Sequence, residues 1–326
     1  MECRLHQNGA TPEMAALLCD IQPEDEIITS SFNFVSAVNP FVLRGAKIVF
    51  VDIRPDTLNI DETLIEKHIT PNTRVILTMH YGGVGCEMEK ILEISEKYGL
   101  WVIEDAAHCL GAYYGDRHLG TMGHLGAISF HATKNIQCGE GGVLLINDER
   151  LLKRAEIIRE KGTDRKLFQR GQVDKYSWVD VGSSYLMNEI SAAFLWGQLS
   201  DTAIVAQKRR EYWKFYHEQL SMPGSIQLPM LPENCTHNGH IFPLLTSLSK
   251  EVMLDLLKAR GIEATFHYVP LHNSRAGKHW GNFKGQDKYT RLAGRHLIRL
   301  PLYVDLTVDE VTYITEELKK ITREII

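Results

Sequence analysis

The stretch SFHATKNIQCGEGG, residues 129–142, places Lys134 just after a short apolar run that ends near Ser129. Glycines follow at positions 139, 141 and 142, and glycine lets a backbone approach another group closely. A lysine in this setting could act as a nucleophile or carry a proton. The alternative is a solvated loop lysine with no chemical role.

A carboxylate and a histidine lie about thirty residues earlier, in WVIEDAAHCLGA, where Asp105 and His108 follow an apolar run. An acid at such a strand end either caps a helix or faces a cationic heterocycle, whose protonated nitrogen it would stabilise. A strand-end Asp, a strand-end Ser and a Lys form the set that pyridoxal phosphate needs. They supply a partner for the ring nitrogen (Asp105), a phosphate ligand (Ser129) and an amine that reacts with the aldehyde (Lys134). The sequence therefore predicts this cofactor.

Short apolar runs alternate with amphipathic segments through the first 150 residues. The runs predicted as strands are 26–30, 47–53, 74–81, 100–106, 126–131 and 141–147, and helices are predicted over 34–45, 59–69 and 88–99. This alternation predicts a mainly parallel central sheet flanked by helices. Ligands of such sheets bind beyond the carboxyl ends of the strands, which is where Asp105 and Ser129 fall.

The rest of the chain predicts a long helical segment and then a second, smaller unit. The helical pattern over 187–220 has a polar break near Ser200–Asp201. Strands near 239–246 and 263–269 and helices near 250–261 and 307–321 follow it. We therefore expect a large cofactor-binding domain over residues 1–210 and a smaller C-terminal α+β domain over 211–326.

Composition excludes several classes of function. The chain has 326 residues and a net charge of −5, which gives no general attraction to nucleic acid or to an anionic membrane. No signal peptide is visible, and no apolar stretch approaches the roughly 20 residues of a membrane span. Six scattered cysteines favour a reducing, cytoplasmic setting. The 14 histidines show no metal-binding spacing, so no metal is predicted.

The motifs EDAAH and SFHATKNIQCGEGG resemble those of the DegT/DnrJ/StrS family of pyridoxal-phosphate-dependent sugar aminotransferases. The likeness extends from about Glu13 to the C-terminus and includes SSFNFVSAVNPFVLRGAKIVFVDIRPDTLNID, MHYGGVGCEME and FHYVPLH. It implies a fold type I aminotransferase and a homodimer with active sites at the subunit interface. It also implies L-glutamate as amino donor and a nucleotide-linked 4-keto-6-deoxy sugar as acceptor, in surface-glycan synthesis of the kind that builds enterobacterial common antigen and lipopolysaccharide.

The resemblance implies roles for four of the residues already discussed. Lys134 matches the catalytic lysine to which the family attaches its cofactor, and Asp105 matches the partner of the ring nitrogen. His108 matches the residue beside the ring and its 3-hydroxyl. Ser129 matches the phosphate-binding serine.

Three more positions match the cofactor site less closely. Phe34, in SFNFVS, falls where the family has an aromatic residue stacked on the ring, although a core aromatic is the alternative. Ser184, in SSYLM, falls where the family often has an asparagine that reaches the phosphate of the neighbouring subunit. Thr11 lies in NGATPEM, where the family has a Ser/Gly-x-Thr-x-Ala-Leu turn before a helix. We expect a shortened N-terminus here, with Gly9, Ala10 and Thr11 as a reduced phosphate cup.

Other functions remain open from the sequence. A sugar 3-dehydratase has the same fold, but that branch has histidine in place of the lysine, so Lys134 disfavours it. The shortened front leaves open the alternative of a catalytically impaired fragment that acts as a binding or scaffolding subunit.

Two further groups have open roles. His267, Tyr268 and His272 in FHYVPLH either reach the sugar or the donor carboxylate, or form a polar strand edge. A basic cluster could attract a diphosphate or be a solvated loop; it consists of Arg165, Lys166, Arg170 and Lys175.

Overall fold

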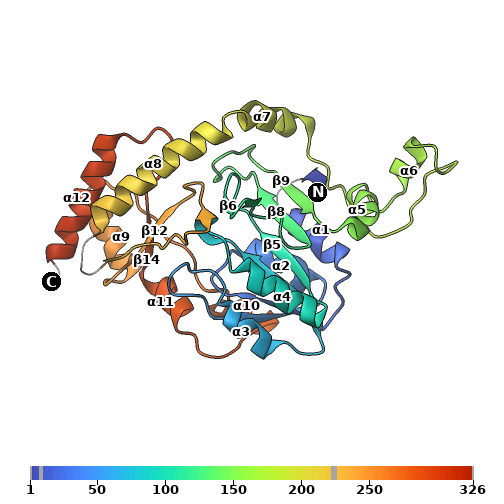
Figure 1. Cartoon of the computed structure of the whole chain (residues 1–326), viewed down its shortest axis with the longest axis horizontal. Helices are drawn as coiled ribbons and strands as arrows, with labels where there is room; N and C mark the ends of the chain where they lie inside the picture. The colour runs from blue at the N-terminus through green and yellow to red at the C-terminus, as the bar shows by residue number, and fades with distance from the viewer. Residues whose placement is uncertain (1, 7–9, 222–225, 325–326) are drawn as a thin grey trace.

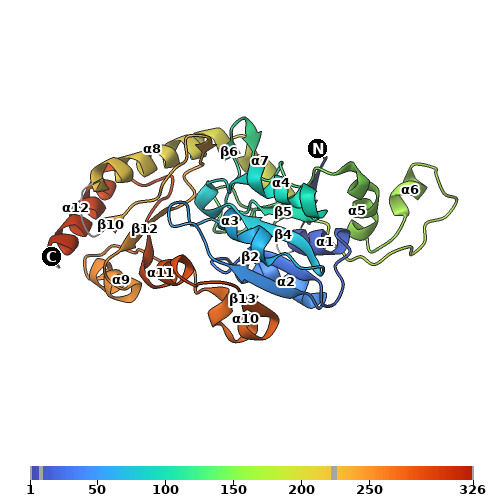
Figure 2. The same cartoon turned by 60° about the horizontal axis from the view of Figure 1, so that its bottom comes forward.

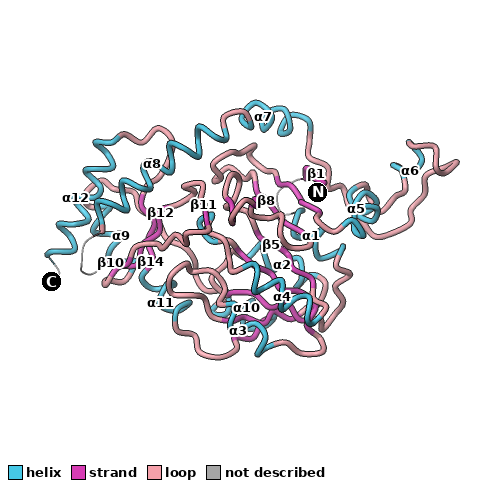
Figure 3. Tube along the Cα trace, in the orientation of Figure 1, coloured by secondary structure: helices cyan, strands magenta, loops and turns pink. Residues whose placement is uncertain are grey.

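An eight-stranded sheet lies at the centre of the computed structural model, which describes residues 2–6, 10–221 and 226–324. The strands follow the order β1-β9-β8-β5-β4-β2-β3-β13. Figure 3 draws the strands in magenta, with the sheet at the centre of the molecule. Their bounds are β1 (Glu2–His6), β2 (Glu26–Ser30), β3 (Lys47–Val51), β4 (Thr73–Met79), β5 (Trp101–Asp105), β8 (Leu125–Ser129), β9 (Gly142–Ile146) and β13 (Gly281–Phe283). Only β9 and β1 run antiparallel to their neighbours, so the predicted mainly parallel sheet is confirmed.

Helices cover both faces of this sheet, which is why its strands are almost continuously apolar. One face packs against α4 (Met88–Tyr98), whose Met88, Ile91 and Ile94 recur at helical spacing. The helix ends at Gly99 in the left-handed conformation, a conformation that glycine adopts without strain. The other face packs against α1 (Ala10–Leu18), α2 (Val35–Leu43) and α5 (Leu152–Arg159).

The C-terminal region has its own three-stranded sheet and apolar core. The sheet contains β10 (Ile226–Gln227), β12 (Phe242–Thr246) and β14 (Leu297–Leu300), and the helices beside it are α8 (Thr202–Leu220), α9 (Lys250–Lys258), α11 (Tyr289–His296) and α12 (Val308–Glu324). In Figure 1, α8 extends from α7 (Glu189–Leu199) to α12. The break between α7 and α8 falls at Ser200–Asp201, as predicted.

Two expected elements differ from the structure. The strand predicted over 263–269 is absent; within this stretch Thr265 alone pairs with Arg299 in β14, by two backbone hydrogen bonds of 2.7 and 3.1 Å. Residues 266–269 then leave the ladder ahead of Pro270, which has no N–H to continue it. The helix expected over 59–69 is divided into α3 (Glu62–Ile65) and a 3-10 turn, Glu66–His68.

The last third of the chain also returns to the large sheet. β13 pairs in parallel with β3 at the sheet edge, directly after α10 (Arg275–Trp280) (Figure 2). The remaining short elements are α6 (Arg165–Gln169) and the three strands β6 (Tyr113–Tyr114), β7 (Arg117–His118) and β11 (Cys235–Thr236). The division at 210/211 remains a prediction, because this strand crosses back over it.

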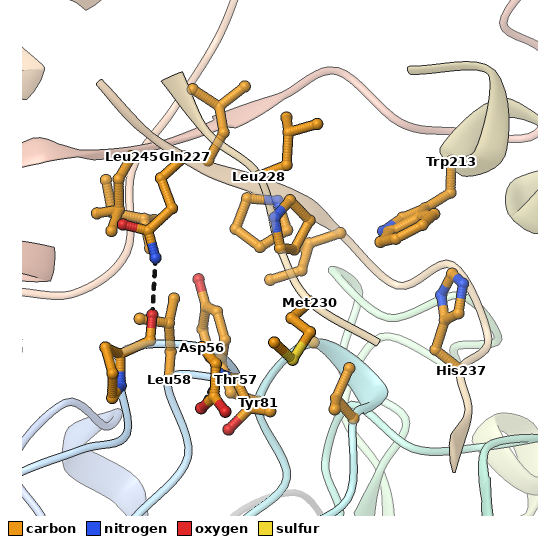
Figure 4. Close-up of a pocket in the computed structure, with 18 residues that line it drawn as sticks. Asp56, Thr57, Leu58, Tyr81, Trp213, Gln227, Leu228, Met230, His237 and Leu245 are labelled. Atoms are coloured by element: carbon orange, nitrogen blue, oxygen red, sulfur yellow. Dashed lines mark hydrogen bonds between the residues drawn. The ribbon is translucent and has the colours of Figure 1, made fainter. Parts of the chain in front are cut away.

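A narrow apolar cavity marks the junction between the two regions (Figure 4). Gln227 of β10 donates a hydrogen bond from Nε2 to the carbonyl oxygen of Pro55, at 2.8 Å. Met230 donates its backbone N–H to the carbonyl oxygen of Asp56. The C-terminal region is thereby fastened to the loop that follows β3, and both regions reach the same larger cavity beside it.

Candidate active site

A cavity of about 870 Å³ opens at the carboxyl ends of the parallel strands, within the range of about 300–1,000 Å³ typical of ligand sites. Asp105 ends β5, Ser129 ends β8, and Lys134 follows on the next loop; all three line the cavity. The structure therefore brings together the three residues on which the cofactor prediction rests. His108, Phe34 and Thr11 line the same cavity.

Asp105 presents a buried carboxylate to this cavity. The carboxylate accepts a hydrogen bond from the backbone N–H of Ala107 at 3.1 Å. Burial raises its pKa, and the positive charge of Lys134 opposes that rise. Among the ion pairs of the described residues none involves Asp105, so its carboxylate remains available to a cationic ring nitrogen.

Glu104, the neighbour of Asp105, has a different environment. Successive side chains of a strand point to opposite faces, and Glu104 is fully buried away from the cavity. Its carboxylate accepts hydrogen bonds from the backbone N–H groups of Gly120, Met122 and Gly123 at 2.6–2.8 Å. The Nε2 of His80 lies 2.9 Å away from it. Glu104 thus fixes the strand end that carries Asp105.

Lys134 is held on a tight turn and shielded from water. Its backbone N–H donates to the carbonyl oxygen of His131 at 2.9 Å. Burial lowers the pKa of its amine, and the charge of Asp105 opposes that effect. A buried amine with a lowered pKa is a better proton acceptor near neutral pH than a solvated lysine.

The glycines after Lys134 serve the folding of this loop. Gly139 has a φ of +76°, in the left-handed region. A Cβ on Gly141 would approach Cys138 Sγ to 2.4 Å, and one on Gly142 would lie 2.7 Å from Thr11 Oγ1. The close approach that the glycines allow is therefore between segments of the protein.

Two hydroxyl groups lie at one end of the cavity, where α1 begins. Ser129 Oγ accepts a hydrogen bond from the backbone N–H of His131 at 3.2 Å. Thr11 is buried, and its Oγ1 has no hydrogen-bond partner in the part of the chain that the structure describes. Pro12, in the first turn of α1, also lines the cavity. Gly9 lies outside the described residues. Hydroxyls beside a helix N-terminus are suited to a phosphate.

Phe34 and Ser184 occupy very different positions. Phe34 precedes α2, and its side chain is 57% exposed at the cavity wall, so the alternative of a core aromatic is wrong. Its stacking on the cofactor ring stays a prediction. Ser184 is exposed and lies outside this cavity, where it forms a backbone bridge with Glu160. Its predicted role concerns the neighbouring subunit and stays a prediction.

His108 belongs to a cluster of buried imidazoles. Its ring centroid lies 4.3 Å from that of His240 and 5.9 Å from that of His267. Burial lowers the pKa of all three rings, to about 2 for His267, so they are neutral at physiological pH. Tyr268 stacks on His267 with centroids 4.2 Å apart. The hypothesis that His267 and Tyr268 belong to the site is consistent with their place in the cavity wall.

The C-terminal region also supplies residues that the sequence analysis missed: Arg209, His240 and Arg299. Arg209 on α8 donates from Nε to the carbonyl oxygen of Gly239 and from Nη2 to that of His240, at 2.9 and 2.7 Å. Arg299 lies in β14. No local motif marks these residues, because each is single and far along the chain from Lys134.

Two groups named from the sequence lie elsewhere. His272 does not line the cavity; its ring contacts Ser31 Oγ at 2.6 Å and Asp287 at 3.1 Å, and it fixes the turn after Pro270. The predicted basic cluster also lies outside the cavity. Two of its members are paired with acids, Arg170 with Glu156 and Lys166 with Glu160, and α6 projects from the body of the molecule (Figure 1).

In residues 2–6, 10–221 and 226–324, no three His, Cys, Asp or Glu side chains gather in a way that could hold a metal ion. Within the same ranges, no helix has the length and apolar character needed to cross a membrane.

The fold and this cavity together define a fold type I aminotransferase. Residues 7–319 match the DegT/DnrJ/EryC1/StrS aminotransferase family, and the chain belongs to that family. It is 34% identical over 320 residues to the uncharacterized protein MJ1066 of Methanocaldococcus jannaschii, covering 95% of this chain and 83% of that protein.

Solved structures agree with this assignment. The aminotransferase TlmJ of Streptoalloteichus hindustanus is 26% identical, with a TM-score of 0.90 over 99% of this chain and 86% of that one. Helicobacter pylori PseC, an aminotransferase involved in pseudoaminic acid biosynthesis, is 25% identical, with a TM-score of 0.90 over 99% and 87%.

The family is dependent on pyridoxal phosphate, which confirms the predicted cofactor at this level. The cavity fits the group. A partly buried amine, a carboxylate free of ion pairs and a buried hydroxyl without a partner among the described residues are the groups that its aldehyde, its protonated ring nitrogen and its phosphate require.

Proposed function

We propose that this enzyme transfers the amino group of L-glutamate to C4 of a nucleotide-linked 4-keto-6-deoxy sugar. The proposed acceptor is dTDP-4-keto-6-deoxy-D-glucose and the product dTDP-4-amino-4,6-dideoxygalactose, used in surface-glycan synthesis. The observation that carries the proposal is the joint placement of Lys134, Asp105 and Ser129 in one cavity. The choice of sugar is supported by the resemblance of the motifs in the N-terminal half of the chain, and of FHYVPLH, to those of sugar aminotransferases.

Each wall of the cavity would hold a different part of pyridoxal phosphate. Ser129 and Thr11 would bind the phosphate beside the N-terminus of α1. Asp105 would pair with the ring nitrogen, His108 would lie beside the ring, and Phe34 would cover one face of it. When bound, the cofactor carries the amino group from donor to acceptor and withdraws electrons from the carbon that loses its proton.

Lys134 is the proposed proton carrier. Its desolvated amine would accept the proton from the carbon that bears the donor amino group, hold it, and release it when the amino group has left that carbon. In the second half of the reaction the same amine works in the opposite direction, at C4 of the sugar. Neutral His108 and His267 beside it add no competing positive charge near neutral pH.

We also propose that the enzyme is a cytoplasmic homodimer in which a second copy covers α7. Along this helix Leu195 is the buried residue, whereas Ile190 is 85% and Trp196 is 79% exposed. Large apolar side chains that are exposed together on one helix are typical of a protein interface. Ser184 lies exposed shortly before α7, a position from which it could reach the partner's cofactor. Five of the six cysteines are free and buried, which supports a reducing compartment; they are Cys19, Cys86, Cys109, Cys138 and Cys235.

The impaired-fragment alternative receives no support from the cavity, where the catalytic lysine and its surroundings lie together. The deciding experiment incubates the purified protein with pyridoxal phosphate, L-glutamate and a panel of nucleotide-linked 4-keto and 3-keto sugars. We expect a new product whose mass and position of amination identify a 4-amino sugar. Amination at C3, or no product with any sugar, would refute the proposed substrate.

The proposed homodimer is tested by measuring the mass of the protein in solution. Light scattering after size exclusion should give the mass of a dimer for the wild type. Replacement of Trp196 by Asp should shift the protein toward monomer, while Trp280→Asp in α10 serves as a control. A wild-type monomer would contradict the homodimer.

A further inference from the structure

Arg299 is a cation in the cavity wall that has no counter-ion among the described residues. It lies in β14 and its backbone pairs with Thr265. Its guanidinium makes no hydrogen bond or ion pair with the residues that the structure describes, and Nε is buried without a partner. Burial lowers its pKa, and Tyr81 and Tyr268 are the groups that oppose this effect. Both are neutral phenols near pH 7.

The other cavity arginine shows what a structural role looks like. Arg209 is buried, but its guanidinium donates to the carbonyl oxygens of Gly239 and His240 and thereby holds that turn in place. Arg299 is half-buried, and its guanidinium makes no such contact with the described residues. A charge partly withdrawn from water without a partner is unfavourable, so the arrangement suits an anion that arrives with a substrate.

The position of Arg299 indicates which anion this is. Arg299 lines the same cavity as Lys134 and His108, and its backbone pairs with Thr265, two residues before His267, so it belongs to the wall that faces the reacting groups. Ser129 and Thr11 already provide for a phosphate on the N-terminal wall. In an amino acid the carboxylate is bonded directly to the carbon that Lys134 would deprotonate. In a sugar nucleotide the diphosphate is attached at C1, across the ring from C4.

We infer that Arg299 binds the α-carboxylate of the amino donor and holds the donor with its reacting carbon beside Lys134. The planar guanidinium can take both carboxylate oxygens in two parallel hydrogen bonds. The inference rests on the proposed aminotransferase function and names the residue that recognises an amino acid in it. An amine without a carboxylate would lose this anchor.

The test uses the holoenzyme with L-glutamate and no sugar, so it does not depend on the identity of the acceptor. Rapid-mixing absorbance follows conversion of the bound cofactor to its amine form. Arg299→Gln should raise the half-saturating L-glutamate concentration by about 10- to 100-fold, the worth of a hydrogen-bonded charged group. Arg299→Lys should recover part of this loss. Arg295→Gln, an exposed arginine on α11 outside the cavity, should leave it unchanged.

A binding measurement accompanies the kinetics. Calorimetry with 2-oxoglutarate, which cannot donate an amine, should give about 10- to 100-fold weaker binding to the Arg299→Gln holoenzyme. Cofactor content and melting temperature report whether that variant is folded. Equal affinity of wild type and Arg299→Gln, or no detectable binding by the wild type, would overturn the inference.

A third arm separates the two anions. If Arg299→Gln weakens binding of dTDP to the holoenzyme while the response to L-glutamate is unchanged, the cation serves the sugar nucleotide and the inference is wrong. Failure of every keto sugar to react would refute the proposed substrate alone, because the glutamate and 2-oxoglutarate measurements would still decide the role of Arg299.

Discussion

The cavity has two walls that differ in how the chain builds them. The N-terminal wall takes Asp105, His108, Ser129 and Lys134 from one stretch of thirty residues, at the ends of neighbouring strands and on the loops after them. The C-terminal wall takes its residues from α8, from the loop before β12, from the stretch between α9 and α10 and from β14.

The two walls are therefore suited to different functions. Groups that handle a proton and a ring nitrogen must be placed with small tolerance, and adjacent strand ends of one sheet provide that precision. Groups that recognise a substrate can come from a region that packs as a separate core. We therefore expect substitutions on the N-terminal wall to affect the chemical step, and those on the C-terminal wall to affect the choice and affinity of substrates.

The largest expected effect is that of Lys134→Ala. No other amine is placed to carry the proton, so the rate should fall by at least about a thousandfold. The melting temperature should change little, since the side chain lines the cavity and makes no ion pair among the described contacts. Borohydride treatment and mass mapping should attach the cofactor to the Lys134 peptide in the wild type and not in the variant.

Lys153→Ala, at an exposed position of α5, is the control for a lost lysine. A Lys134→Ala protein that retains more than a few per cent of activity would remove this residue from the mechanism. The N-terminal wall would then no longer be the wall whose residues carry the chemical step.

Asp105→Asn should lower the rate by roughly a hundredfold, which is typical for loss of one preorganised charge at a reacting group. An amide does not stabilise a protonated ring nitrogen, whereas the phosphate ligands stay intact. Cofactor content, read from absorbance after desalting, should therefore fall much less than kcat. Equal losses of cofactor and rate would show that Asp105 holds the cofactor and does not tune it.

The sequence was sufficient for most of the sheet because its strands are short apolar runs with clear ends. Lys134 and Asp105 could be named because a reactive motif is local. Arg299 could not, since a single arginine in HLIRLPL shows neither its burial nor the lack of a partner until β14 is folded against Thr265. The strand expected over 263–269 failed for a related reason, because its polar residues leave the ladder to face the cavity.

Glu104→Gln tests how firmly the N-terminal wall is held. The carboxylate accepts three backbone N–H groups and faces His80, and an amide NH₂ in its place would oppose one or more donors. We expect the free energy of unfolding to fall by about 3 kcal/mol, in the range for a buried charged group that loses hydrogen bonds. Urea denaturation at pH 7 measures it, with the exposed Glu93→Gln as control.

The same variant has a defined pH dependence. Burial opposes ionisation of Glu104, but hydrogen bonds from His80 and the backbone amides outweigh it and lower the pKa. A carboxyl with a lowered folded-state pKa stabilises the fold fully above its unfolded value of about 4.3 and loses this contribution as the pH falls through the folded value. The stability gap between wild type and Glu104→Gln should therefore shrink in acid. A gap that is constant down to pH 3 would assign the effect to packing.

The smallest expected effect is that of Thr11→Val. This variant should stabilise the apoprotein but weaken the binding of the cofactor. In the absence of cofactor, Thr11 Oγ1 is a buried hydroxyl without a hydrogen-bond partner among the described residues, and replacing it with a methyl group of similar size removes an unfavourable burial. The apoprotein should therefore melt slightly higher. The holoprotein should bind pyridoxal phosphate about tenfold more weakly, because one hydrogen bond to a charged phosphate is lost.

Thr29→Val is the matched control for these two effects on stability and cofactor affinity. Thr29 Oγ1 is also buried without a partner, but Thr29 lies in β2 and does not line the cavity. Its replacement should raise the melting temperature and leave cofactor affinity unchanged, as measured by fluorescence titration. If Thr11→Val also leaves the affinity unchanged, the phosphate is held by Ser129 and the amides of α1 alone. The side chains of the N-terminal wall that act on the cofactor would then all come from the strand ends and loops between Asp105 and Lys134, and α1 would contribute backbone amides only.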